Sequence, residues 1–105
     1  AQLSAASSRP MTDIELSRAL RQLRRTVDML QTELRHGRID AGLLDDIEAR
    51  MERGLGTDPR CHGLNGQVDA LRESTLTPRP ELLGDAIRCC EKLKDAIEGI
   101  SSRLG

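Results

Sequence analysis

Leucine and valine recur at heptad spacing in the first third of the chain. Successive apolar positions are separated by 4, 3, 4, 3 and 4 residues, so they fall on one side of an α-helix, as in coiled coils. Thr12 and Glu15 have the spacing of an N-terminal capping box, and Gly37 is a candidate C-terminal cap. The pattern therefore predicts one helix over residues 12–36. We call its apolar positions the first seam; they are Leu16, Leu20, Leu23, Val27, Leu30 and Leu34.

A second seam with the same kind of spacing lies near the C-terminus and predicts a helix over residues 78–103. Thr77 and Pro78 fit the N-cap and the first helical position of this helix. The second seam consists of Leu83, Ala86, Cys90, Leu93, Ile97, Ile100 and Leu104.

Shorter helices are predicted between the two seams. Apolar residues at helical spacing indicate one helix near residues 40–54, behind Asp40 as N-cap, and another near residues 64–74. Residues 56–66 are rich in glycine and contain a proline, which indicates a loop. At Gly37 two geometries are open, because the chain either turns into a helical hairpin or continues as one longer helix. The turn is favoured.

The composition excludes sheet folds. None of the 105 residues is Phe, Tyr or Trp, and leucine outnumbers valine and isoleucine together, whereas β-sheets rely on aromatic and β-branched side chains. The fold class is therefore expected to be all-α. We expect a disordered lead-in over residues 1–10 and a single helical domain over residues 11–105.

Charge and cysteine usage argue against several kinds of partner. The net charge is −1 at pH 7, so no overall field favours nucleic acid or a membrane surface. No apolar run approaches the roughly 20 residues that span a bilayer, and the first ten residues lack the apolar core of a secretory signal.

The three cysteines, an odd number, fit a reducing, intracellular compartment better than a disulfide framework.

An arginine stripe follows the first predicted helix. Arginine can contact phosphates, but heptad helices ordinarily carry solvated charges off the seam. Residues 39–58 carry a net charge of −4 against +2 for residues 11–38, and this acidic neighbour argues against a nucleic-acid groove. Nucleic acid is therefore not an expected partner. The stripe consists of Arg18, Arg21, Arg24 and Arg25.

The side chains that could bind metal or act as nucleophiles form no recognisable site. Cys61 and His62 are adjacent, as are Cys89 and Cys90, whereas zinc ligands are typically spaced about two to four residues apart. A Cys–His nucleophile also needs a pocket that excludes water, and the glycine-rich segment around Cys61 offers no core to build one. The sequence predicts no enzyme, no metal or other cofactor and no small-molecule substrate.

The seams could be the core of an ordinary helical bundle, but their narrowness favours association between chains. The first seam occupies two positions in seven, which is narrower than the apolar face usual in globular bundles, and a small chain buries little apolar surface alone. We therefore expect that the first seam has no adequate burial partner in its own chain, and that hairpins or coiled coils assemble as a homo-oligomeric helical bundle. The predicted interface consists of Leu16, Leu20, Leu23, Val27, Leu30, Leu34, Leu44, Met51, Leu83, Cys90, Leu93, Ile97 and Ile100.

Residues 44–55, LDDIEARMERGL, resemble a stretch in the central oligomerisation region of bornavirus phosphoproteins. Residues 32–34 and 39–41 are similar to neighbouring segments if a gap of about one helical turn is allowed. The resemblance implies a polymerase cofactor that self-associates through a parallel coiled coil, usually a tetramer, and bridges polymerase and nucleoprotein in the nucleus or cytoplasm of an infected cell. The prolines and glycines after residue 55 depart from the long continuous helix of that family and leave the first seam as the assembly element.

Two functions are consistent with these patterns. The first is a non-enzymatic oligomerisation scaffold, of the kind found in a viral polymerase cofactor, which acts through avidity. The alternative is a small helical adaptor or chaperone that covers an amphipathic helix of a partner protein, similar in size and pattern to type III secretion needle chaperones. Purified alone, a scaffold is expected to be a stable homo-oligomer, whereas an adaptor is expected to be monomeric, loosely folded or aggregating.

Overall fold

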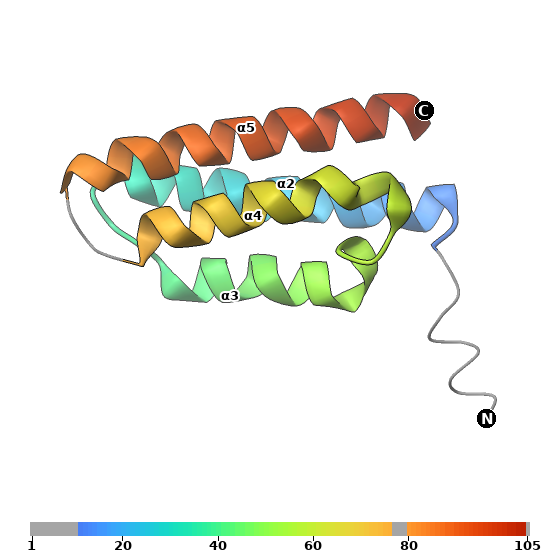
Figure 1. Cartoon of the computed structure of the whole chain (residues 1–105), viewed down its shortest axis with the longest axis horizontal. Coiled ribbons are helices and arrows are strands. Elements are labelled where there is room, and N and C mark those ends of the chain that lie inside the picture. Colours follow the sequence, from blue (N-terminus) through green and yellow to red (C-terminus); the bar gives the residue numbers. More distant parts are fainter. Residues whose placement is uncertain (1–10, 77–79, 105) are drawn as a thin grey trace.

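The computed structural model describes residues 11–76 and 80–104, and these residues are almost entirely helical (Figure 1). The all-α fold expected from the sequence is confirmed. The predicted lead-in over residues 1–10 and the predicted helix start at Thr77 and Pro78 lie outside the described residues. Within the described part, four α-helices and two short helical turns follow one another: α2 (Asp13–Arg35), α3 (Ala41–Arg50), the π-helical turn η1 (Met51–Leu55), the 3₁₀ turn η2 (Pro59–Cys61), α4 (His62–Thr75) and α5 (Pro80–Leu104).

Consecutive helices run in opposite directions and form an up-down-up-down bundle (Figure 1). α2 packs against α5 and α3, and α4 packs against α5 and more lightly against α3. Two ion pairs are consistent with the antiparallel packing of α2 and α5. Arg24 Nη2 lies 2.6 Å from Glu98 Oε1, and Asp28 Oδ1, further along α2, lies 3.1 Å from Lys94 Nζ, earlier in α5. In this register the end of α5 lies beside the start of α2.

The capping box predicted at the start of the first helix is present. The Oγ1 atom of Thr12 accepts a hydrogen bond from the Glu15 backbone N–H at 3.2 Å, and Oε1 of Glu15 accepts one from the Thr12 backbone N–H at 2.9 Å. Two backbone donors that a helix start leaves without intrahelical partners are thereby satisfied. Helix α2 therefore begins where the sequence places it.

The chain turns sharply after α2, as the favoured of the two geometries predicts. Gly37 has a φ of +81°, its N–H donates to the carbonyl of Leu34, and the N–H of Arg38 donates to the carbonyl of Glu33 at 2.9 Å. These bonds are a Schellman motif, which ends a helix with a residue in the left-handed region, normally glycine. Asp40 then caps α3 by accepting from the Leu43 N–H at 3.1 Å, so one long continuous helix does not form.

The first seam lies in the interior of the bundle. Its residues are at most 1% exposed, and they share one apolar core with side chains from every other α-helix. The expectation that this seam lacks a burial partner in its own chain is therefore wrong. The core residues that other helices contribute include Ile47, Leu64, Leu71, Leu93 and Ile97.

Two buried polar residues beside the first seam explain this error. Thr26 is 6% exposed and Gln31 is fully buried, and their helical positions lie on opposite flanks of the seam. Thr26 Oγ1 donates to Asp46 Oδ2 of α3 at 2.9 Å, whereas Gln31 Nε2 donates to Glu91 Oε2 of α5 at 2.7 Å. The buried face of α2 is thus wider than its apolar stripe, with α3 on one side and α5 on the other.

The predicted helix near residues 40–54 is divided in the structure. Helix α3 ends at Arg50 and continues as η1, in which Gly54 has a φ of +144°. This backbone conformation is strained for any residue with a Cβ atom, so glycine at this position allows the chain to leave the helix. Ile47 of α3 and Leu55 of η1 are nonetheless buried in the core.

The predicted loop over residues 56–66 is shorter than expected, because η2 and α4 occupy residues 59–66. Asp58 caps this helical stretch by accepting from the Arg60 backbone N–H at 2.9 Å. Glycine disfavours a helix interior by only about 1 kcal/mol relative to alanine, and the complete burial of Leu64 outweighs that cost. Composition alone therefore placed the start of α4 too late.

The second seam faces the same core from α5. Its central residues are buried, and Leu83 and Leu104 near the two ends of the helix are half-buried. The apolar residues of both seams therefore pack in the core of one chain. The buried members of the second seam are Ala86, Cys90, Leu93, Ile97 and Ile100.

Candidate functional site

Two of the three cysteine side chains, Cys61 and Cys90, belong to the core, and Cys89 is partly buried beside it. Cys61 and Cys90 are fully buried, and burial raises the pKa of their thiols to about 11 and about 12, respectively. Both thiols therefore stay protonated at neutral pH, and a protonated thiol is a poor nucleophile. Within residues 11–76 and 80–104, no group of three or more His, Cys, Asp or Glu side chains is arranged to hold a metal ion.

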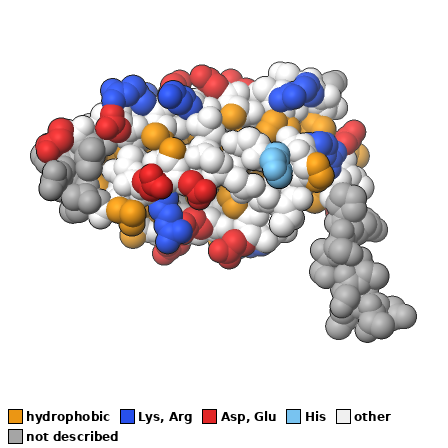
Figure 2. Space-filling model, in the orientation of Figure 1, with side chains coloured by type: hydrophobic (Ala, Val, Ile, Leu, Met, Phe, Trp, Pro, Cys, Tyr) orange, Lys and Arg blue, Asp and Glu red, His pale blue; other side chains and the backbone are white. Residues whose placement is uncertain are grey.

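The residues predicted as an interface between chains are core residues in this structure. Apart from Leu44 and Leu83, which are half-buried and pack against the core, all of them are buried. Their side chains hold the bundle together, and among the side chains that the structure describes the exposed large hydrophobic residues are Ile14, Met29 and Leu76, which lie apart from one another in the sequence. The face that carries α4 has charges of both signs with scattered apolar spots between them (Figure 2).

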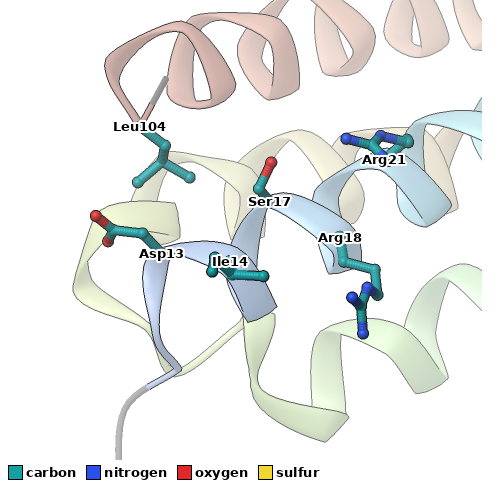
Figure 3. A pocket seen from close by; sticks show the side chains of 6 residues that line it. All are labelled: Asp13, Ile14, Ser17, Arg18, Arg21 and Leu104. Carbon is teal, nitrogen blue, oxygen red and sulfur yellow. The ribbon is translucent and has the colours of Figure 1, made fainter.

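The arginine stripe, in contrast, lies on the exposed side of α2, and part of it lines an open groove. The groove has a volume of about 280 Å³ and lies where the start of α2 passes the end of α5 (Figure 3). In Figure 3 Leu104, at the end of α5, points toward Asp13 and Ile14 on the first turn of α2. We call this the basic groove; it is lined by Asp13, Ile14, Ser17, Arg18, Arg21 and Leu104.

The bundle geometry produces this groove. Helix α5 ends at Leu104, beside the first turns of α2, so one side of α2 is left uncovered there. Ile14 is off the heptad pattern of the first seam and therefore points outward, with 72% of its surface exposed. The groove thus combines an exposed apolar side chain with guanidinium groups.

The charge in the basic groove is predominantly positive. The carboxylate of Asp13 accepts a hydrogen bond from Arg60 Nη1 at 2.7 Å, which offsets its negative charge. Neither Arg18 nor Arg21 forms an ion pair or hydrogen bond with any other residue that the structure describes. Guanidinium groups that are free on an exposed face can bind carboxylates in a bidentate manner.

Arg60, which pairs with Asp13 of the groove, also contacts Asp58 and the residue before the α2 cap. Its guanidinium donates to both carboxylate oxygens of Asp58, at 3.0 Å and 2.9 Å, and to the backbone oxygen of Met11 at 2.6 Å. Asp58 is only 4% exposed, and the Arg60 guanidinium holds the pKa of this carboxyl below its usual range, against the opposing effect of burial. These contacts tie the segment before α4 to the start of α2.

The arginines of the groove were identifiable from the sequence, but its other parts were not. The arginine stripe contains Arg18 and Arg21, whereas the heptad pattern places Leu104 in the second seam and leaves Ile14 outside both seams. A large apolar residue on the polar side of an amphipathic helix was the available signal for Ile14. The Asp58-Pro59 pair, an N-cap residue followed by proline, was the available signal for the cluster around Arg60.

Comparison with known proteins finds no match for this chain among protein-family models, curated proteins or solved structures. Residues 44–55, the basis of the expected likeness to bornavirus phosphoproteins, lie in α3 and η1, where α3 packs antiparallel to α2; that likeness stays a prediction. None of the helices described is both long and apolar enough to cross a membrane.

Proposed function

We propose that this chain is a non-enzymatic protein-interaction module whose basic groove binds an acidic amphipathic segment of a partner protein. The observation that carries the proposal is the exposure of Ile14. This apolar side chain is 72% exposed in a groove that is also lined by Arg18 and Arg21. This is the adaptor class of function, with the binding surface on the outside of α2 rather than on the first seam.

The chemistry of the groove favours a protein partner over a small molecule. Binding sites for small molecules are typically concave and enclose most of the ligand surface, whereas this groove is a shallow depression at a helix end. Protein interfaces are enriched in arginine around apolar anchors. An amphipathic helix could place apolar residues on Ile14 and Leu104 and carboxylates on the two arginines.

Burial of the first seam argues against a scaffold that assembles through that seam. Exposing it to a second chain would open a core in which the leucines of α2 are at most 1% exposed. Nothing in the basic groove favours polymerase or nucleoprotein over another protein with an acidic segment.

A designed peptide tests the proposal. The probe is a fluorescein-labelled helical peptide of about 18 residues with leucines at i, i+3 and i+4 spacing and glutamates beside them; its counterpart has lysine in place of every glutamate. We expect the acidic peptide to raise the fluorescence anisotropy saturably on titration with the protein. Arg18→Glu should weaken binding roughly tenfold or more, because it places like charges together, and Ile14→Ser should weaken it by removing the apolar anchor.

The matched control is Lys92→Glu, which makes the same charge change at an exposed position on α5 away from the groove. This variant should bind the acidic peptide as the unmodified protein does. Equal affinity for the acidic and basic peptides, or equal losses for Arg18→Glu and Lys92→Glu, would contradict the proposal.

A further inference from the structure

A second groove lies toward the other end of α2, between that helix and the start of α3. Its volume is about 300 Å³, close to that of the basic groove. Met29, half exposed at 50%, and Leu43 supply its apolar surface. We call it the acidic groove; it is lined by Asp28, Met29, Thr32, Glu33, Asp40 and Leu43.

The two grooves are complementary in charge and alike in size. The lining of the basic groove contains two arginines and one aspartate, whereas that of the acidic groove contains three carboxylates and no cation. Three large hydrophobic residues are exposed in the described part of the chain. Two of them line the grooves: Ile14 lines the basic groove and Met29 lines the acidic groove. Both grooves are lined mainly by α2, roughly 22 Å apart along the helix axis, given the rise per residue.

We propose that the partner of the basic groove is the acidic groove of a second copy of this chain. Two α2 helices that meet antiparallel would place the basic groove of each copy against the acidic groove of the other. The interface is then isologous, so each groove contact occurs twice and the assembly closes as a dimer. This inference rests on the proposed function and names the partner of that same groove.

The local ion pairs leave the acidic groove able to accept further donors. Asp28 accepts from Lys94 at 3.1 Å and Glu33 pairs with Arg38 at 3.2 Å, while Asp40 caps α3. The Asp28 carboxylate is 58% exposed, and an ionised carboxylate can accept about four hydrogen bonds. Arginines from a second copy can therefore add to these pairs without displacing them.

A charge-swap experiment tests the dimer. The first variant, Arg18→Glu/Arg21→Glu, reverses the basic groove; the second, Asp28→Lys/Glu33→Lys, reverses the acidic groove. Each variant alone places like charges together at both contacts. Its dimer dissociation constant should therefore rise roughly tenfold or more. Mixed one to one, the two variants have opposite charges at both contacts and should recover the dimer. Sedimentation velocity at about 50 mM salt, where charge interactions extend furthest, measures the mass.

Two further measurements sharpen the test. The dimer of the unmodified chain should weaken in about 0.5 M salt because the contacts are electrostatic. Arg25 is exposed on α2 between the two grooves and would lie near the dimer axis beside its own copy. Arg25→Ala should therefore leave the dimer intact or tighten it.

Several results would overturn the inference. A chain that stays at the mass of one subunit while still binding the acidic peptide would refute the dimer but leave the proposed function in place. A dimer that survives both charge reversals, or a mixture that fails to recover it, would place the interface elsewhere. Assemblies that keep growing with concentration would exclude a closed isologous pair. Failure of the acidic peptide to bind a chain that sedimentation shows to be a single subunit refutes the proposed function independently, because no second copy then covers the basic groove.

Discussion

Leu23→Asp is expected to unfold the isolated chain rather than to separate folded subunits. Leu23 is fully buried in the middle of α2. Removing a leucine side chain from a core costs about 2–5 kcal/mol, and a buried carboxylate without a partner adds to that cost. Small domains have a total free energy of unfolding of about 5–15 kcal/mol, so one such change removes much or all of it.

Far-UV circular dichroism combined with size-exclusion chromatography checks this expectation. The variant should lose most of its helical signal and elute as an expanded chain. Arg25→Asp is the matched control, because it introduces the same side chain on the exposed side of the same helix, where substitutions usually change stability by less than about 0.5 kcal/mol. A Leu23→Asp chain that kept its helicity and only lost mass would mean that the first seam joins separate subunits.

Asp58→Ala is expected to produce the second-largest loss of stability. Asp58 caps the η2 turn and accepts from the Arg60 guanidinium with both carboxylate oxygens. Loss of a cap costs about 0.5–2 kcal/mol, and hydrogen bonds to charged groups contribute about 1.5–3 kcal/mol, so a combined loss of about 2–5 kcal/mol follows. Asp58→Asn keeps the capping oxygen, so its free energy of unfolding should fall less than that of Asp58→Ala.

The stability that Asp58 contributes should also depend on pH. The Arg60 guanidinium keeps the pKa of this carboxyl lower in the folded chain than its usual value. A lowered pKa means that the contribution is complete above the unfolded pKa of about 3.9 and is lost as the pH falls through the folded value. Urea unfolding from about pH 6 to pH 2 should therefore bring the original chain and Asp58→Asn closer together in stability. A constant difference across that range would contradict this role for the ion pair.

The helices of this fold were predictable because their signals are local. The capping box at Thr12, the glycine that ends α2 and the heptad spacing of both seams depend on residues a few positions apart. Their burial partners were not predictable from the same patterns. Thr26 and Gln31 look like surface residues in the sequence, yet α3 and α5 bury them by supplying hydrogen-bond partners. Only the three-dimensional arrangement reveals that width of the buried face.

The basic groove illustrates the same limit for function. The arginines were visible as a stripe along one helix, but a stripe does not say which side chains from other helices lie beside it. Leu104 joins Ile14 in the groove only because α5 runs antiparallel to α2 and ends beside its first turns. Ile14 and Met29 themselves are single apolar residues on a polar face, which are common on protein surfaces and gain meaning only from the grooves around them.

The central claim is that the first seam is the core of a single folded chain, and thermal unfolding over a dilution series tests it most directly. The measurement is made by circular dichroism in about 0.5 M salt, which screens contacts between charged surfaces, at roughly 1 to 100 µM protein. A core closed within one chain predicts one cooperative transition whose midpoint stays constant across the series. A midpoint that rises by several degrees with concentration would mean that folding requires association, and that the leucines of α2 are buried by another molecule.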